Sequence, residues 1–119
     1  MSQDFQAGDF LIFQIESAYG LLRILAVEET ENGTVWHLAA YNEMFLDIET
    51  ADAALENSSS LTVSCSHLAV TNRAFESTQV ARMKNEPLSR DESKPYREWT
   101  ENPNRNVSDT SVRLLLGLR

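Results

Sequence analysis

Two nearly continuous apolar runs, joined by only a few residues, constrain this chain of 119 residues more than any other feature. They occupy residues 10–16 (FLIFQIE) and 19–28 (YGLLRILAVE). Both are rich in aromatic and β-branched side chains and too short to favour a buried helix, so we expect two strands. Because apolar side chains occur at successive positions, both faces of these strands are expected to be covered over much of their length.

A third strand is predicted at residues 34–41 (TVWHLAAY). It follows Asn32-Gly33, a dipeptide typical of type I′ hairpin turns, in which both central residues have positive φ. The three strands are therefore expected to form an antiparallel meander.

The middle of the chain mixes weaker patterns. Thr50 is expected to cap a short helix. Residues 61–65 alternate with a period of two and predict a strand that continues towards residue 70. Residues 72–84 are compatible with helix or strand, and we favour a turn at 72–75 followed by a strand at 79–83.

The last third favours helices. Ser89 with Glu92 three residues later has the pattern of a capping box, and Tyr96 and Trp99 would form the inward face of the helix that follows. Pro95 is expected to kink this helix or to make it restart.

A closing helix is predicted after Ser108, which would cap it. Its three consecutive leucines, 114–116, must pack on something, and one option is the same helix of a second copy. A homo-oligomer formed through this leucine-rich helix is therefore one hypothesis.

These elements predict an α+β fold. The expected architecture is a bent antiparallel sheet or small SH3-like barrel with the C-terminal helices packed on it. We expect one domain over residues 1–119, mainly strands in 1–70 and mainly helical in 85–119.

Composition indicates a protein of the cytoplasm. No run approaches the ~20 apolar residues that span a bilayer, and the N-terminus lacks the pattern of a secretion signal. The one cysteine, Cys65, excludes an internal disulfide framework.

The charges are unevenly distributed. Of the 18 acidic residues, eleven lie in the first 60 residues, together with only one of the ten basic residues, Arg23. This balance disfavours nucleic acid and anionic membranes as partners and favours a basic protein partner. The residues expected to bind that partner are Glu28, Glu29, Glu31, Glu43, Asp47 and Glu49. The alternative is an acidic face that only keeps the protein in solution.

The sequence favours neither a metal site nor catalysis. Cys65 and His67 are expected on the same face of one strand, with His37 as a third candidate ligand, but zinc sites normally use four ligands and no second pair exists. A nucleophilic Cys65 would sit within a strand, whereas nucleophiles usually lie at turns or helix starts. We expect no catalytic residue, metal or cofactor.

An aromatic-lined groove near Trp36 and Tyr41 is the alternative binding site. In that case the chain would be a small-ligand or regulatory domain. Both hypotheses describe a binding module and not an enzyme.

Three segments carry a resemblance. The Gly8-Asp9 step, the strand 19–25 and the segment 85–89 that leads to Tyr96 and Trp99 resemble those of a group of small bacterial proteins that includes immunity proteins of polymorphic toxin systems. The resemblance implies an SH3-like bent sheet followed by helices, and a protein that binds and neutralises a toxin without catalysis of its own. No site residue is carried over from it.

Overall fold

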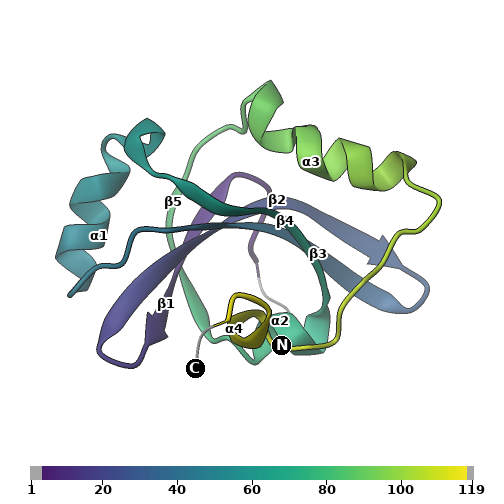
Figure 1. Cartoon of the computed structure of the whole chain (residues 1–119), viewed down its shortest axis with the longest axis horizontal. Helices are drawn as coiled ribbons and strands as arrows, with labels where there is room; N and C mark the ends of the chain where they lie inside the picture. Colours follow the sequence, from purple (N-terminus) through teal and green to yellow (C-terminus); the bar gives the residue numbers. More distant parts are fainter. Residues whose placement is uncertain (1–3, 118–119) are drawn as a thin grey trace.

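The computed structural model describes residues 4–117, which form an α+β fold built on one antiparallel sheet (Figure 1). The five strands of this part of the chain are β1 (Asp9–Ile15), β2 (Ala18–Thr30), β3 (Gly33–Tyr41), β4 (Val63–Thr71) and β5 (Val80–Asn85). Their order across the sheet is β4-β3-β2-β1-β5. The predicted meander is therefore confirmed. For residues 72–84 the expected strand is present, but the expected turn at 72–75 is a short helix, Asn72–Glu76.

The sheet is open. Among the strands of the described residues, β4 pairs only with β3 and β5 only with β1, and the two do not pair with each other. Of the two predicted forms, the bent open sheet is present and the closed barrel is not.

The β2–β3 hairpin lies where it was predicted, but its turn is of a different type. Thr30 pairs with Gly33, and Gly33 has φ of 108°. Among the described non-glycine residues, positive φ occurs only at Glu16 and Gln79, so Asn32 does not have it. The type I′ prediction is therefore wrong, because the left-handed conformation falls on the glycine alone.

The helices are α1 (Ile48–Leu55), α2 (Asn72–Glu76), α3 (Arg90–Glu101) and α4 (Val112–Leu115), with a 3₁₀ turn, η1, at Ser58–Ser60. Two predicted caps are wrong. Asp47 and not Thr50 caps α1, and its carboxylate accepts the Thr50 N–H at 2.8 Å. Ser111 and not Ser108 caps α4.

Ser108 instead pairs with the free edge of β4. Its N–H donates to the Ala69 carbonyl at 2.8 Å, and its carbonyl accepts the Thr71 N–H at 2.9 Å. Ser108, which was predicted to cap the closing helix, thus forms a backbone pairing with a strand that is far away in the sequence.

The capping box at α3 is confirmed, because Ser89 accepts the Glu92 N–H and the Glu92 carboxylate accepts the Ser89 N–H. The predicted restart at Pro95 is wrong, since α3 continues through it. The proline removes one hydrogen bond, to the carbonyl of the exposed Asp91, where water can replace it.

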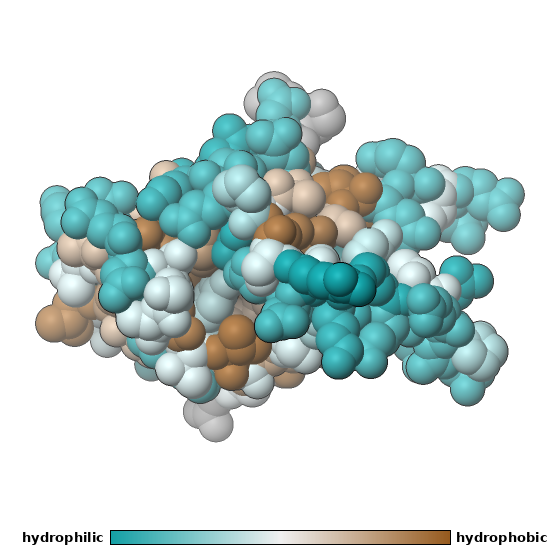
Figure 2. Space-filling model, turned by 90° about the horizontal axis from the view of Figure 1, so that it is seen from above, coloured by the Kyte–Doolittle hydropathy of each residue, from teal (hydrophilic) through white to brown (hydrophobic). Residues whose placement is uncertain are grey.

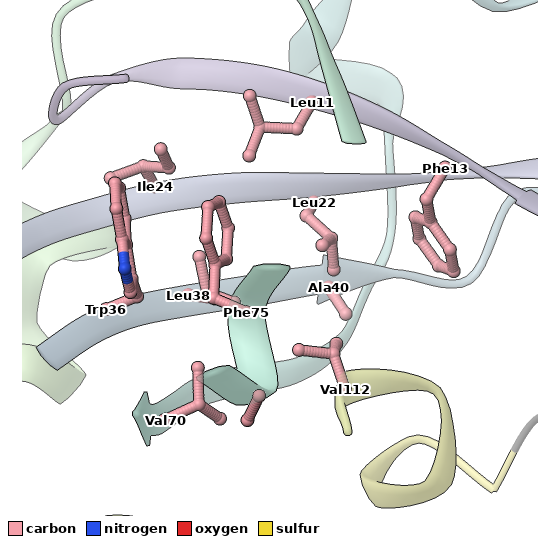
Figure 3. Close-up of a cluster of buried hydrophobic side chains, with 11 residues drawn as sticks. Leu11, Phe13, Leu22, Ile24, Trp36, Leu38, Ala40, Val70, Phe75 and Val112 are labelled. Atoms are coloured by element: carbon pink, nitrogen blue, oxygen red, sulfur yellow. The ribbon is translucent and has the colours of Figure 1, made fainter. Parts of the chain in front are cut away.

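Each face of the sheet has its own apolar core and its own helices. On one face, which we call the α2/α4 face, strand side chains pack against Phe75 of α2 and Val112 of α4 (Figure 3). Trp36 stacks on Phe75 there, with ring centroids 4.1 Å apart. On the other face, the α3 face, α1 covers one end of the sheet and α3 crosses above the rest (Figure 1). No helix within residues 4–117 is long and apolar enough to cross a membrane.

Candidate functional site

A β-bulge in β2 decides which side chains lie on the α3 face. Ile24 pairs with Leu38 and Ala26 pairs with His37, so Leu25 is an extra residue on β2. An extra residue inverts the alternation of side chains beyond it.

The consequence is visible at the end of β2. Before the bulge, Leu22 and Ile24 face the α2/α4 core, and after it Val27 does so. Glu28 therefore turns to the α3 face, where its carboxylate reaches His37. In a regular strand it would share a face with Leu22 and Ile24, inside an apolar core.

A second bulge separates Cys65 from His67. Leu38 pairs with Leu68, but Ala40 pairs with Cys65, so β4 carries an extra residue here. Cys65 packs against the α2/α4 core, whereas His67 stacks on His37. The prediction that Cys65 and His67 share a face is thus wrong.

On the α3 face, Glu28, His37 and His67 form a hydrogen-bonded chain. His37 Nε2 lies 3.0 Å from Glu28 Oε1, and His37 Nδ1 lies 3.0 Å from His67 Nε2. With both rings neutral, His37 Nε2–H donates to the carboxylate and His67 Nε2–H donates to His37 Nδ1. Burial lowers the pKa of His37, partly offset by Glu28, and burial together with His37 lowers the pKa of His67 to about 4.

Two aromatic side chains of α3 cover this chain. The ring centroids of Tyr96 and Trp99 lie 4.5 and 4.6 Å from that of His37, which is fully buried. Burial, with a contribution from Glu28, raises the pKa of Tyr96. The inward face predicted for Tyr96 and Trp99 is confirmed, and its counterpart on the sheet is the histidine pair.

The other attachment of α3 is Arg23, which is only 2% exposed. Its Nη1 donates to Glu92 Oε2 at 2.8 Å, and its Nε and Nη2 donate to the carbonyls of Gly8 and Glu86 at 3.0 and 2.8 Å. Its guanidinium lies 4.0 Å above the Phe10 ring. One buried cation thus joins β2, the N-terminal segment and the start of α3.

Gly8 is required for this arrangement. It has φ of 93°, and a Cβ at this position would lie 2.4 Å from the Glu86 carbonyl oxygen. A side chain here would push apart two of the carbonyls that Arg23 holds together.

A cavity of about 490 Å³ opens on the α3 face, between η1 on one side and the first turns of α3 on the other. Its floor includes Arg23 and Tyr41, and its apolar walls include Leu25, Leu61 and Val63. The volume is within the range of about 300–1,000 Å³ that is usual for small-molecule sites.

The polar groups of the cavity come from its floor and from both of its sides. Burial raises the pKa of Tyr41, although Arg23 acts in the opposite direction, so its phenol stays protonated at neutral pH and can donate a hydrogen bond. Three acids, Glu86, Asp91 and Glu92, and one base, Arg23, line the cavity. The excess of carboxylates disfavours an anionic ligand.

The acidic residues predicted to bind a partner form two groups. Glu28, Glu29 and Glu31 lie at the tip of the β2–β3 hairpin, whereas Glu43, Asp47 and Glu49 follow the other end of β3 (Figure 1). The length of β3 separates the groups by roughly 25 Å. They do not form one continuous surface.

Three of these acids also have roles within the fold. Glu28 bonds to His37, Asp47 caps α1, and Glu43 accepts the Thr62 N–H at 2.9 Å. Hydrogen bonds to Thr62 and Thr50 lower the pKa values of Glu43 and Asp47, respectively. At the exposed hairpin tip, Glu29 accepts the Thr34 hydroxyl at 2.8 Å. Glu31 and Glu49 are the two acids of this set whose side chains make no hydrogen bond among the described residues.

Trp36 and Tyr41 do not line a common groove. They lie an odd number of residues apart on β3 and so point to opposite faces: Trp36 into the α2/α4 core and Tyr41 into the α3 face. Only Tyr41 lines the cavity. Within residues 4–117, no three His, Cys, Asp or Glu side chains are grouped so that they could hold a metal ion.

Sequence reasoning missed Arg23 and Glu92 as site residues. Arg23 was recognisable as the single base in an apolar run, a position where a charged residue needs partners. Glu92 was noted only as a capping residue, and nothing local indicated that its carboxylate also binds Arg23.

Comparison with protein-family models, curated proteins and solved structures finds no match to this chain. The resemblance to bacterial immunity proteins therefore stays a prediction. The function has to be argued from the cavity and its surroundings.

Proposed function

We propose that this chain is a non-enzymatic, cytoplasmic small-ligand-binding domain whose site is the cavity between η1 and α3. The cavity itself carries the proposal, because it combines apolar walls with a few convergent polar groups, the usual composition of ligand sites. The cavity also lies beside α3, whose start is attached to the sheet through the Arg23–Glu92 ion pair. This position supports the proposal further.

The ligand is an uncharged or cationic molecule with an apolar body. Leu25, Leu61 and Val63 would contact the body, and the Tyr41 hydroxyl would donate to an acceptor on the ligand. The carboxylates near the start of α3 would accept hydrogen bonds from an amine or hydroxyl. A carboxylate or phosphate would be repelled by the same groups.

Blocking the cavity tests this proposal. Ser66 is exposed, lies on β4 and lines the cavity, so Ser66→Trp would fill the opening without disturbing the core. We expect that compounds raising the melting temperature of the wild type in a thermal-shift screen of neutral and cationic molecules no longer do so with this variant.

Ser64→Trp is the matched control, because Ser64 is exposed on the same strand but does not line the cavity. It should keep every shift. Equal shifts in the wild type and Ser66→Trp would place binding elsewhere, and a screen without any shift would contradict the ligand-binding proposal.

A second candidate is a protein-binding module, of which an immunity-type inhibitor is one form. It is favoured by Glu29 and Glu31, which are exposed at the β2–β3 hairpin tip. Figure 2 shows mainly hydrophilic side chains at the end of the molecule that carries this tip (right). The partner would have a basic surface that meets this acidic tip.

This candidate predicts strongly salt-dependent binding. In the double variant Glu29→Lys/Glu31→Lys, association with a captured basic partner should slow by about tenfold and lose most of its salt dependence. The measurement is the association rate at two salt concentrations. Glu49→Lys, at the other end of the sheet, serves as the control, and unchanged rates in the double variant would exclude the hairpin tip.

A further inference from the structure

We propose that α3 is a lid over the ligand cavity, and that double protonation of the His37–His67 pair releases it. The lid can be tested without any ligand, and only its connection to ligand release rests on the proposed function.

Few contacts attach α3 to the sheet. None of the residues Arg90–Glu101 is buried. The helix is held by the Arg23–Glu92 ion pair at its start and by Tyr96 and Trp99 resting on the histidine pair. Elements with few buried apolar contacts open at lower free energy than the core does.

The geometry of the pair accommodates one added proton but not two. His37 Nδ1 and His67 Nε2 face each other at 3.0 Å, with a single hydrogen between them. A first added proton leaves this hydrogen bond intact, because one nitrogen of the facing pair can still accept. A second added proton puts N–H against N–H and two positive charges side by side, so the rings must separate.

Few charged groups can compensate for a doubly protonated pair. Glu28 of β2 faces His37, and Tyr96 of α3 lies over both rings and is neutral at acidic pH. Arg105, after α3, lines a neighbouring hollow together with Glu28 and Trp99 and adds positive charge. Within residues 4–117, Glu28 is therefore the one carboxylate in contact with the two histidines.

The sign of the pH dependence follows from these contacts. With α3 closed, the pKa of His67 is lowered from 6.5 to about 4. With α3 open, the ring is hydrated and its pKa returns towards 6.5, so the open state binds more protons between these values. The population of the open state should rise on the order of 100-fold between pH 7 and pH 4.

Opening α3 would also open the cavity. Ser89, Asp91, Glu92 and Pro95 supply the wall that faces η1. When α3 leaves the sheet, this wall is lost together with the Glu92 partner of Arg23. A ligand held between η1 and α3 would be released at acidic pH.

Amide hydrogen exchange, resolved by NMR or by mass spectrometry, tests the lid in the ligand-free protein. Protection factors, which correct for the intrinsic pH dependence of exchange, are compared at pH 7 and pH 4 for residues 90–101 and for β2 and β3. We expect the protection of α3 to fall by one to two orders of magnitude while the two central strands stay protected.

His67→Gln provides the decisive comparison. The glutamine amide can still donate to His37 Nδ1 but does not titrate, and the chain has only the two histidines. The variant keeps every carboxylate of the wild type, so any acid effect that they cause would remain. Protection of α3 that is independent of pH in the wild type, or that falls equally in His67→Gln, would overturn the proposal.

Ligand release is measured separately. A compound found in the thermal-shift screen should dissociate between pH 7 and pH 4 from the wild type but not from His67→Gln. If α3 opens at acidic pH but no compound binds, the lid proposal is supported and the ligand-site proposal is contradicted. If compounds bind but α3 stays closed at acidic pH, the ligand-site proposal is supported and the lid proposal is contradicted.

Discussion

Arg23 is the residue that best explains how the α3 face is organised. It is a buried cation in an apolar strand, and its partners belong to three separate segments. A buried charge without partners is costly, so each of these segments is held near β2 by the need to neutralise or solvate the guanidinium. The cavity is formed beside this anchor.

Replacing Arg23 should destabilise the protein far more than replacing an exposed arginine. Arg23→Met keeps most of the side-chain volume but leaves the Glu86 carbonyl and Glu92 Oε2 without their donor and removes one of the two donors of the Gly8 carbonyl, which should cost about 3 kcal/mol in urea unfolding. Arg97→Met, on the exposed surface of α3, should change stability by less than about 0.5 kcal/mol. Similar values for the two variants would contradict the role assigned to Arg23.

At the scale of single residues, the sequence contained a signal for Arg23 that was missed and no signal for its partners. A lone arginine in an apolar run is recognisable, because burial of a charge requires compensation. Glu86 and Glu92 lie more than 60 residues further along the chain. Their approach to Arg23 depends on where β5 and α3 pack, which no local pattern contains.

Elements with local determinants were predicted well. The first three strands follow from their apolar runs, and α3 begins at a capping box that is complete within four residues. The caps at Thr50 and Ser108 were predicted wrongly because another side chain was available nearby. Asp47 caps α1 in place of Thr50, and Ser108 pairs with β4 and so does not cap α4.

The bulges could not be predicted from the sequence, and they determine the site. Alternation places Glu28 with the core residues of β2, and the extra residue Leu25 moves it to His37. The bulge in β4 moves His67 away from Cys65 in the same way. A bulge depends on the pairing of two strands, so a pattern along one strand does not indicate it.

The whole molecule is a sheet with two differently covered faces. The α2/α4 face is an apolar core, whereas the α3 face combines apolar side chains with a buried arginine, a histidine pair and a cavity. We expected helices to cover one face of the doubly apolar strands and the curled sheet to cover the other, but helices lie on both faces because the sheet is open. Of the site residues predicted for a groove, Tyr41 alone lines the cavity, because the sheet separates it from Trp36.

At the scale of the whole molecule, the central proposal is that ligands bind on the α3 face. Titration of the isotope-labelled protein with the strongest compound of the thermal-shift screen, followed by amide and methyl chemical shifts, tests it most directly. We predict that the largest shifts occur at Tyr41, Leu61, Val63 and the start of α3, and that Ser66→Trp abolishes them. Shifts confined to the α2/α4 face or to the hairpin tip would contradict the claim.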